Sequence, residues 1–181
     1  MEDLSLHILD VVENSIAAQA KRIEIRVNED MERDLLSIEI VDDGKGMDEE
    51  MVKNAVNPFF TTRTTRRVGL GLPLFAAAAR QSNGTFQIES RPGKGTEVRA
   101  TFQESHIDRK PWGKMSDTLV TLIMGNPDVD FYFSHRKGDF DYTLDTSDIR
   151  SGIEGLPMNH PTVIAAIRKN LKENLGTVGI G

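Results

Sequence analysis

Apolar and polar residues alternate with a period of two along four short stretches of the first hundred residues. Residues 23–27 alternate in this way, and the same rhythm returns at 36–41, 86–88 and 98–102. A period of two is typical of a strand with one buried face. A polar segment at residues 28–33 separates the first two stretches, so we predict that they form a hairpin.

Apolar residues three or four positions apart predict helices around these strands. The first helix runs from about Leu4 to Ala20. The second begins at Asp48, a favoured N-cap residue, and runs to about Val56. A third follows the glycine-containing segment 69–72. Because each strand has a single apolar face, we predict an α/β (α+β) two-layer sandwich, in which helices pack on one face of a mostly antiparallel sheet.

A polar segment at residues 103–114 separates this pattern from a second one, and we interpret it as a linker. The apolar spacing beyond it predicts helices at 117–124 and 161–175 and strands at 129–135 and 140–144. We therefore divide the chain into a domain at 1–102 and a linker with a C-terminal extension at 103–181, whose role the sequence does not give. The hairpin of the extension either adds to an edge of the main sheet or forms a docking module.

Composition narrows the classes of function. The chain has 181 residues, with 22 basic and 28 acidic side chains and a net charge of −6. This balance disfavours nucleic acid or a membrane surface as the partner. Cysteine is absent, which excludes disulfides, thiolate metal sites and a cysteine nucleophile. The N-terminal residues show neither a signal peptide nor a membrane span, so we expect a cytoplasmic protein.

Two segments of the first domain carry candidate chemistry. On the first helix, Asp10 and Asn14 lie one turn apart on the same face. At the end of the second strand, Asp42 is followed by Gly44 and Gly46. A carboxylate beside backbone without Cβ atoms suits a flat ligand that donates a hydrogen bond. A solvated helix face and a tight Asp-Gly turn are the alternatives.

Two further segments suit phosphate. Residues 57–67 show no periodicity and are rich in threonine and arginine, whose side chains donate to phosphate oxygens. An exposed loop is the alternative. Residues 69–72, Gly-Leu-Gly-Leu, lead into a helix, and the start of a helix offers free N–H groups and a positive dipole end.

These segments, in this order, resemble the ATP-binding fold of the GHKL superfamily (gyrase, Hsp90, histidine kinase and MutL). Residues 13–20 resemble its N box, and 42–46 match its first glycine box, DxGxG. Residues 58–62 (PFFTT) and 69–72 (GLGL) resemble the histidine-kinase branch, and 93–96 match the last box. The resemblance covers about residues 4–102.

The resemblance implies roles for individual residues. Asp42 would accept a hydrogen bond from the adenine amino group, with Thr96 near the same pocket. Asn14 would bind Mg²⁺, and residues 47–68 would form a lid that places Arg63, Arg66 or Arg67 near the phosphates. The implied nucleotide-binding residues are Asn14, Asp42, Gly44, Gly46, Met47, Phe60, Thr61, Thr62, Arg63, Gly69, Leu70, Gly71, Leu72 and Thr96.

Asp10 occupies the position at which ATPases of the superfamily and anti-sigma-factor serine kinases carry a glutamate, whereas histidine kinases carry an asparagine. A carboxylate there accepts a proton from water or a serine hydroxyl, although aspartate reaches one methylene less far. Glu13 is a neighbouring candidate. The phosphoacceptor, whether serine, histidine or water, stays open.

We therefore expect an Mg·ATP-binding protein, a stand-alone protein kinase or ATPase that acts on a protein partner. The alternative is a regulatory module that senses ATP or ADP without phosphoryl transfer. Residues 118–123 and 126–131 resemble small ATP-binding proteins that accompany electron-transferring iron hydrogenases, which would imply an accessory role. A homodimer is left open.

Overall fold

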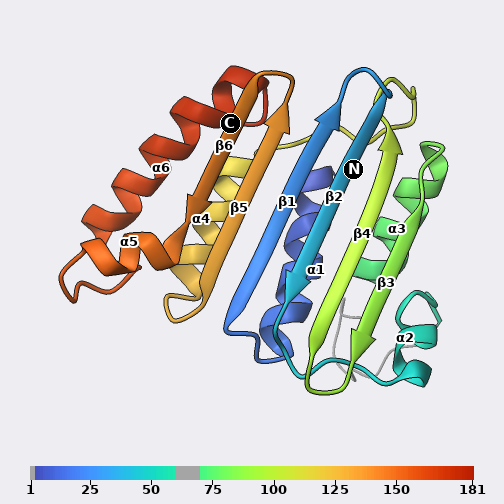
Figure 1. Cartoon of the computed structure of the whole chain (residues 1–181), viewed down its shortest axis with the longest axis horizontal. Helices are drawn as coiled ribbons and strands as arrows, with labels where there is room; N and C mark the ends of the chain where they lie inside the picture. The colour runs from blue at the N-terminus through green and yellow to red at the C-terminus, as the bar shows by residue number, and fades with distance from the viewer. Residues whose placement is uncertain (1–2, 60–69) are drawn as a thin grey trace.

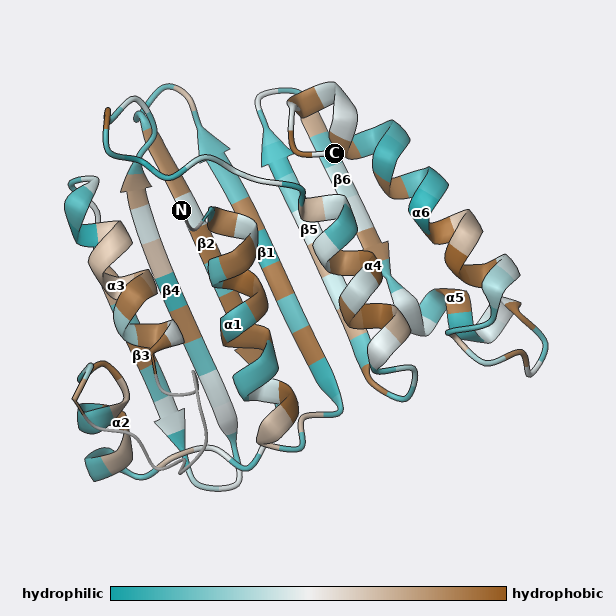
Figure 2. Ribbon diagram, turned by 180° about the vertical axis from the view of Figure 1, so that it is seen from behind, coloured by the Kyte–Doolittle hydropathy of each residue, from teal (hydrophilic) through white to brown (hydrophobic). Residues whose placement is uncertain are grey.

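The computed structural model describes residues 3–59 and 70–181, which form one six-stranded sheet with helices on one face (Figures 1 and 2). The strand order is β3-β4-β2-β1-β5-β6. The strands are β1 (Arg22–Asp30), β2 (Leu35–Asp42), β3 (Phe86–Arg91), β4 (Gly95–Gln103), β5 (Asp130–Lys137) and β6 (Phe140–Asp145). The helices are α1 (Leu4–Ala17), α2 (Glu49–Ala55), α3 (Gly71–Gln81), α4 (Met115–Gly125), α5 (Thr146–Gly152), α6 (Pro161–Leu175) and the 3-10 helix η1 (Gly176–Val178).

The predicted two-layer sandwich is confirmed. Four of the five strand pairs are antiparallel, and β1 with β5 is the parallel one. The alternation predicted for β1 is present: Ile23, Ile25 and Val27 face the helices and are almost fully buried. Figure 2 shows α1, α3 and α4 in front of the sheet, where their apolar residues meet the apolar face of the strands.

The opposite face of the sheet carries charged side chains that pair with one another. Arg26 forms ion pairs with Glu24 and Glu39, and Arg99 pairs with Glu39 and Glu97. This face therefore stays hydrated, which explains why each strand needs only one apolar side.

The extension continues the main sheet, which is one of the two alternatives open from the sequence. Its strand β5 lies beside β1 with Ile23 opposite Phe131 and Ile25 opposite Phe133. All four side chains belong to a single apolar core. The segment 103–114 is also tied to the first helix, because the Leu4 amide donates to the Pro111 carbonyl at 2.9 Å.

A cluster around one buried carboxylate joins β1 to β5 at the end of the strands away from Asp42. It consists of Glu29, His135 and Lys137, which we call the far-end cluster. Glu29 accepts from His135 Nε2 at 2.7 Å and pairs with Lys137 Nζ at 2.8 Å; the side chains of Glu29 and His135 are 0% exposed. Burial alone would raise the pKa of Glu29, but His135 and Lys137 outweigh it and lower that pKa.

Two predicted helix ends differ from the structure. Helix α1 ends at Ala17, not at Ala20, because Gln19 takes a positive φ of 62° and the Ala20 amide bonds back to the Ser15 carbonyl. This left-handed stop turns the chain into β1. Helix α4 begins at Met115, earlier than predicted.

No helix in the part of the chain that the structure describes is long and apolar enough to cross a membrane.

Candidate functional site

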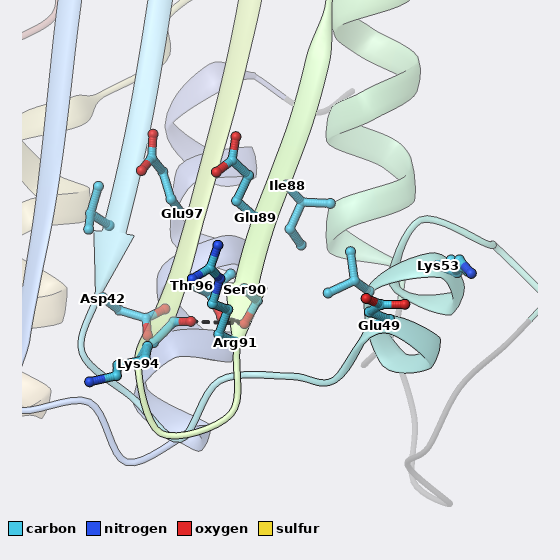
Figure 3. A pocket seen from close by; sticks show the side chains of 13 residues that line it. Asp42, Glu49, Lys53, Ile88, Glu89, Ser90, Arg91, Lys94, Thr96 and Glu97 are labelled. Carbon is cyan, nitrogen blue, oxygen red and sulfur yellow. Dashed lines mark hydrogen bonds between the residues drawn. The ribbon is translucent and has the colours of Figure 1, made fainter.

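A cavity of about 530 Å³ lies beside α2, where β2 and β3 end and β4 begins. Its lining includes Asp42, Ser90 and Thr96 from the strands, and Val52 and Lys53 from α2 (Figure 3). The cavity therefore brings together Asp42 and Thr96, which the sequence analysis assigned to one pocket although they lie 54 positions apart.

Asp42 is the last residue of β2, and its carboxylate is fixed by two neutral donors. Its side chain lies on the helix side of the sheet and the residue is 8% exposed. Oδ2 accepts from Ser15 Oγ at 2.6 Å, and Oδ1 accepts from the Gly44 amide at 2.8 Å. An ionised carboxylate offers about four acceptor positions, so Asp42 keeps capacity for a ligand. The bond to Gly44 also closes a tight Asp-Gly turn, the alternative considered from the sequence. A turn residue and a ligand-binding carboxylate are therefore compatible interpretations of Asp42.

The glycines around Asp42 allow two turns to interlock. Gly46 has a φ of +70°, and a Cβ there would lie 2.0 Å from the Arg91 carbonyl oxygen. Gly95 has a φ of +84°, and its Cβ would lie 1.9 Å from the Asp42 carbonyl oxygen. At both glycines, the backbone of the opposite turn occupies the place that a side chain would take. The 42–47 turn therefore packs directly against the 91–95 turn. That the backbone at Gly44 and Gly46 also approaches a base stays a prediction.

Ser90 connects these turns and was missed by the sequence analysis. Its Oγ accepts from the Met47 amide at 2.8 Å, donates to the Gly95 carbonyl at 2.8 Å and lies 2.8 Å from Thr96 Oγ1. Ser15 was missed as well. Both serines occupy positions where the periodicity predicts an apolar residue. Ser90 continues the alternation of Phe86 and Ile88, and Ser15 lies on the buried stripe of α1. A polar residue at such a position is the signal that could have revealed them.

The other predicted residues lie at the meeting of α1 and α3. Asp10 and Asn14 are half-buried on α1. Helix α3 starts at Gly71, where a Cβ would lie 2.9 Å from the Asp10 Cβ, so the first turn of α3 approaches Asp10 closely. Leu70, the N-cap residue, gives α3 no side-chain cap. Leu72 packs against the core.

Part of the predicted site lies outside the described residues. These positions are Phe60, Thr61, Thr62, Arg63, Arg66, Arg67 and Gly69.

The described residues fit a nucleotide with a bound ion better than an ion alone. Within residues 3–59 and 70–181, no group of three or more histidine or acidic side chains could hold a metal. A Mg²⁺ ion bound through phosphates needs few protein ligands. The Asn14 side chain carries a neutral amide oxygen on the face of α1 that carries Asp10, and that this oxygen binds Mg²⁺ stays a prediction.

This fold and site define a class of protein: an α/β sandwich with a cavity at one end of the sheet, bordered by a buried carboxylate. The family described as "Histidine kinase-, DNA gyrase B-, and HSP90-like ATPase" matches residues 2–106. The chain belongs to this family, and the expected GHKL membership is confirmed.

Curated relatives include bacterial sensor kinases and a mismatch repair protein. Sensor histidine kinase YvrG of Bacillus subtilis is 30% identical over 95 residues, which cover 50% of this chain and 16% of that protein. Sensor protein kinase FleS of Pseudomonas aeruginosa is 40% identical over 89 residues, 49% of this chain and 22% of that protein. DNA mismatch repair protein MutL of Bacillus licheniformis is 27% identical over 96% of this chain and 28% of that protein. The chain thus spans less than a third of the length of these relatives.

Solved structures share the fold over most of the chain. The MutL ATPase domain of Aquifex aeolicus complexed with ADP has a TM-score of 0.56 and 18% identity, and covers 85% of this chain and 68% of that one. The N-terminal domain of a DNA repair protein has a TM-score of 0.55 and 16% identity, and covers 95% of this chain and 56% of that one. These matches include part of the extension, whereas the two sensor kinases match only about half of the chain.

Proposed function

We propose that the chain binds ATP in the cavity, with the base against Asp42 and Thr96 and the phosphates towards the first turn of α3. The observation that carries the proposal is the Asp42 carboxylate, which is buried, borders the cavity and is held by two neutral donors. Such a group retains acceptor capacity for an exocyclic amino group. Membership of the ATPase family and the likeness to an ADP-bound MutL domain support it.

Mg·ATP bound in this way would supply a transferable γ-phosphoryl group. Asn14 would offer its amide oxygen to the ion, and the free N–H groups at the start of α3 would hold phosphate oxygens. Asp10, which adjoins that turn at Gly71, would accept the proton of the attacking water or hydroxyl group. We propose on this basis an ATPase or protein kinase that acts on a protein partner in the cytoplasm.

The second candidate is a nucleotide sensor without phosphoryl transfer. It is favoured by a series of contacts from the cavity to the extension. Asp43, next to Asp42, accepts from the Arg22 amide at 2.9 Å, and the Arg22 guanidinium binds both oxygens of Asp145 at 3.3 and 3.0 Å. Asp145 in turn caps α5. A change at the Asp42 turn would reach the extension through these groups.

The two candidates differ in what Asp10→Asn does. The full chain is incubated with γ-labelled ATP, alone and with candidate partner proteins, and label is followed on protein and as free phosphate. For the enzyme we expect turnover to fall about a hundredfold or more, while ATP affinity changes less than about threefold. Equal, slow turnover in both proteins would support the sensor. Glu13→Gln tests the neighbouring carboxylate, which is exposed, and a loss there instead would move the role of base to Glu13.

A further inference from the structure

We propose that Ser90 determines which base the cavity accepts, because it holds the hydroxyl proton of Thr96 away from the ligand. The inference rests on the proposed function, since it concerns the specificity of the same cavity. Ser90 would act through Thr96 and is therefore a positioning residue.

Ser90 Oγ has three hydrogen-bond partners, the Met47 amide, the Gly95 carbonyl and Thr96 Oγ1. A serine hydroxyl has one proton to donate and two lone pairs. The Gly95 carbonyl can only accept, so the Ser90 proton points to it at 2.8 Å. The Met47 amide can only donate, so it occupies one Ser90 lone pair at 2.8 Å. One lone pair remains on Ser90.

Thr96 Oγ1 lies 2.8 Å from Ser90 Oγ. Because the Ser90 proton is committed to Gly95, Thr96 must be the donor in this pair. Thr96 has one proton as well, and Ser90 takes it. Thr96 is half-buried at the cavity wall, where it therefore offers lone pairs and no proton.

The cavity then presents two acceptors to the edge of a base, Thr96 and the Asp42 carboxylate, on neighbouring strands (Figure 3). An adenine ring carries an amino group, a donor, at C6. The two N–H bonds of that amino group can satisfy both acceptors. A hypoxanthine ring carries a carbonyl oxygen at C6 and a single donor, N1–H, on this edge, so one acceptor meets the oxygen, which stays unpaired and loses binding free energy. The Ser90–Thr96 bond thus makes the cavity favour a 6-amino purine over a 6-oxo purine.

Removing the Ser90 hydroxyl should release the Thr96 proton for the ligand. In Ser90→Ala, Thr96 can rotate its hydroxyl and donate to the C6 carbonyl of inosine triphosphate (ITP). ITP differs from ATP only at this edge of the ring, so it isolates the effect. We expect the ratio of the dissociation constants, Kd(ITP)/Kd(ATP), to fall about tenfold, the change associated with one satisfied hydrogen bond.

The experiment measures both dissociation constants by titration calorimetry on the full chain. Ser90→Thr, which restores a hydroxyl, should return the ratio to the wild-type value. In a Thr96→Val background, Ser90→Ala should leave the ratio unchanged, because no hydroxyl remains to be released. Ser82→Ala is the matched control: Ser82 is a buried serine at the C-cap of α3 that donates to the Ala78 carbonyl.

A purely structural role for Ser90 would lower both affinities together and leave the ratio unchanged, which would overturn the inference. The ratio compares two ligands on one variant, so loss of the Met47 and Gly95 bonds does not imitate the effect. Thermal unfolding reports whether Ser90→Ala is folded, and Ser90→Cys, a much weaker donor and acceptor, is the second variant if it is not. Absence of ATP binding by the wild-type chain would overturn the proposed function itself.

Discussion

Two buried carboxylates lie under the same helix layer, and their partners give them different roles. Glu29 in the far-end cluster is bound by His135 and Lys137, so a cation satisfies its charge. Asp42 is bound by a hydroxyl and a backbone amide, both neutral, and has no ion pair within the described residues. Trp112 and Phe140 pack against His135, whereas Asp42 lines a cavity. A buried carboxylate without a countercharge, at a cavity, is available to a ligand; one that is neutralised by its neighbours stabilises the fold.

The largest effect that tests the comparison of Glu29 with Asp42 is the loss of stability when the charge of Glu29 is removed. Breaking a buried ion pair by removing one partner typically costs 3–5 kcal/mol. We expect Glu29→Gln to lower the free energy of unfolding in urea by about 3 kcal/mol without changing ATP affinity in the folded protein. Glu32→Gln, at an exposed position in the adjacent turn, is the control.

The Glu29 effect also has a defined pH dependence. Because His135 and Lys137 hold the folded-state pKa of Glu29 below its ordinary value of 4.5, its contribution is complete above that pH and is lost as the pH falls through the folded-state value. Wild type and Glu29→Gln should therefore converge in acid. Loss of ATP affinity with unchanged stability would contradict the role assigned to Glu29.

Asp42→Asn is the matching test at the cavity. A hydrogen bond to a charged group contributes about 1.5–3 kcal/mol, so we expect ATP affinity to fall about 30-fold, while the free energy of unfolding changes by less than about 1 kcal/mol. Asp43→Asn is the control, since Asp43 is exposed and, within residues 3–59 and 70–181, its side chain accepts only from the Lys21 and Arg22 amides. Calorimetry and urea unfolding on the same samples separate the two effects, and unchanged ATP affinity would remove Asp42 from the site.

The smallest effect concerns Asp145, a partly exposed carboxylate. The Arg22 guanidinium, assisted by Ser147, lowers the pKa of Asp145 from 3.8 to about 2. Its contribution to stability is thus complete above about pH 4 and is lost as the pH falls from 4 towards 2. We expect about 1 kcal/mol, because Arg22 is partly solvated.

Asp145→Asn should reduce the loss of stability between about pH 4 and pH 2. Because asparagine is also a favoured N-cap residue, the variant still caps α5. Asp141→Asn, which removes the partner of Arg136 in an exposed ion pair, should leave the fall in place. If both variants behave alike in urea unfolding at pH 4 and pH 2.5, then Arg22 and Asp145 do not form a stabilising pair.

The elements that the sequence predicted correctly depend on local patterns. The strand β2 and the turn at Asp42 follow from alternation and from the residues that such a turn favours. Helix α2 follows from its N-cap, and the structure confirms that Asp48 accepts from the Met51 amide at 2.8 Å. These signals lie within a few residues of one another, so one sequence is enough to find them.

The features that escaped depend on contacts between distant segments. Ser15 matters because Asp42 comes within 2.6 Å of it, across 27 positions. Glu29 and His135 are 106 positions apart, and each alone resembles an ordinary polar residue in a strand. The place of the extension was equally open, because the apolar face of β5 would suit either a sheet edge or a separate module.

The parallel pairing of β1 with β5 has a consequence for synthesis on the ribosome. Strand β1 ends at Asp30 and β5 begins at Asp130, so β1 emerges about 100 residues before its neighbour. At roughly 5–20 residues per second, its outer edge waits on the order of 5–20 seconds with unpaired backbone groups beside Ile23, Ile25 and Val27. An open edge of this kind recruits other chains. The nascent protein therefore passes through an interval of aggregation risk that ends only when the extension has been made.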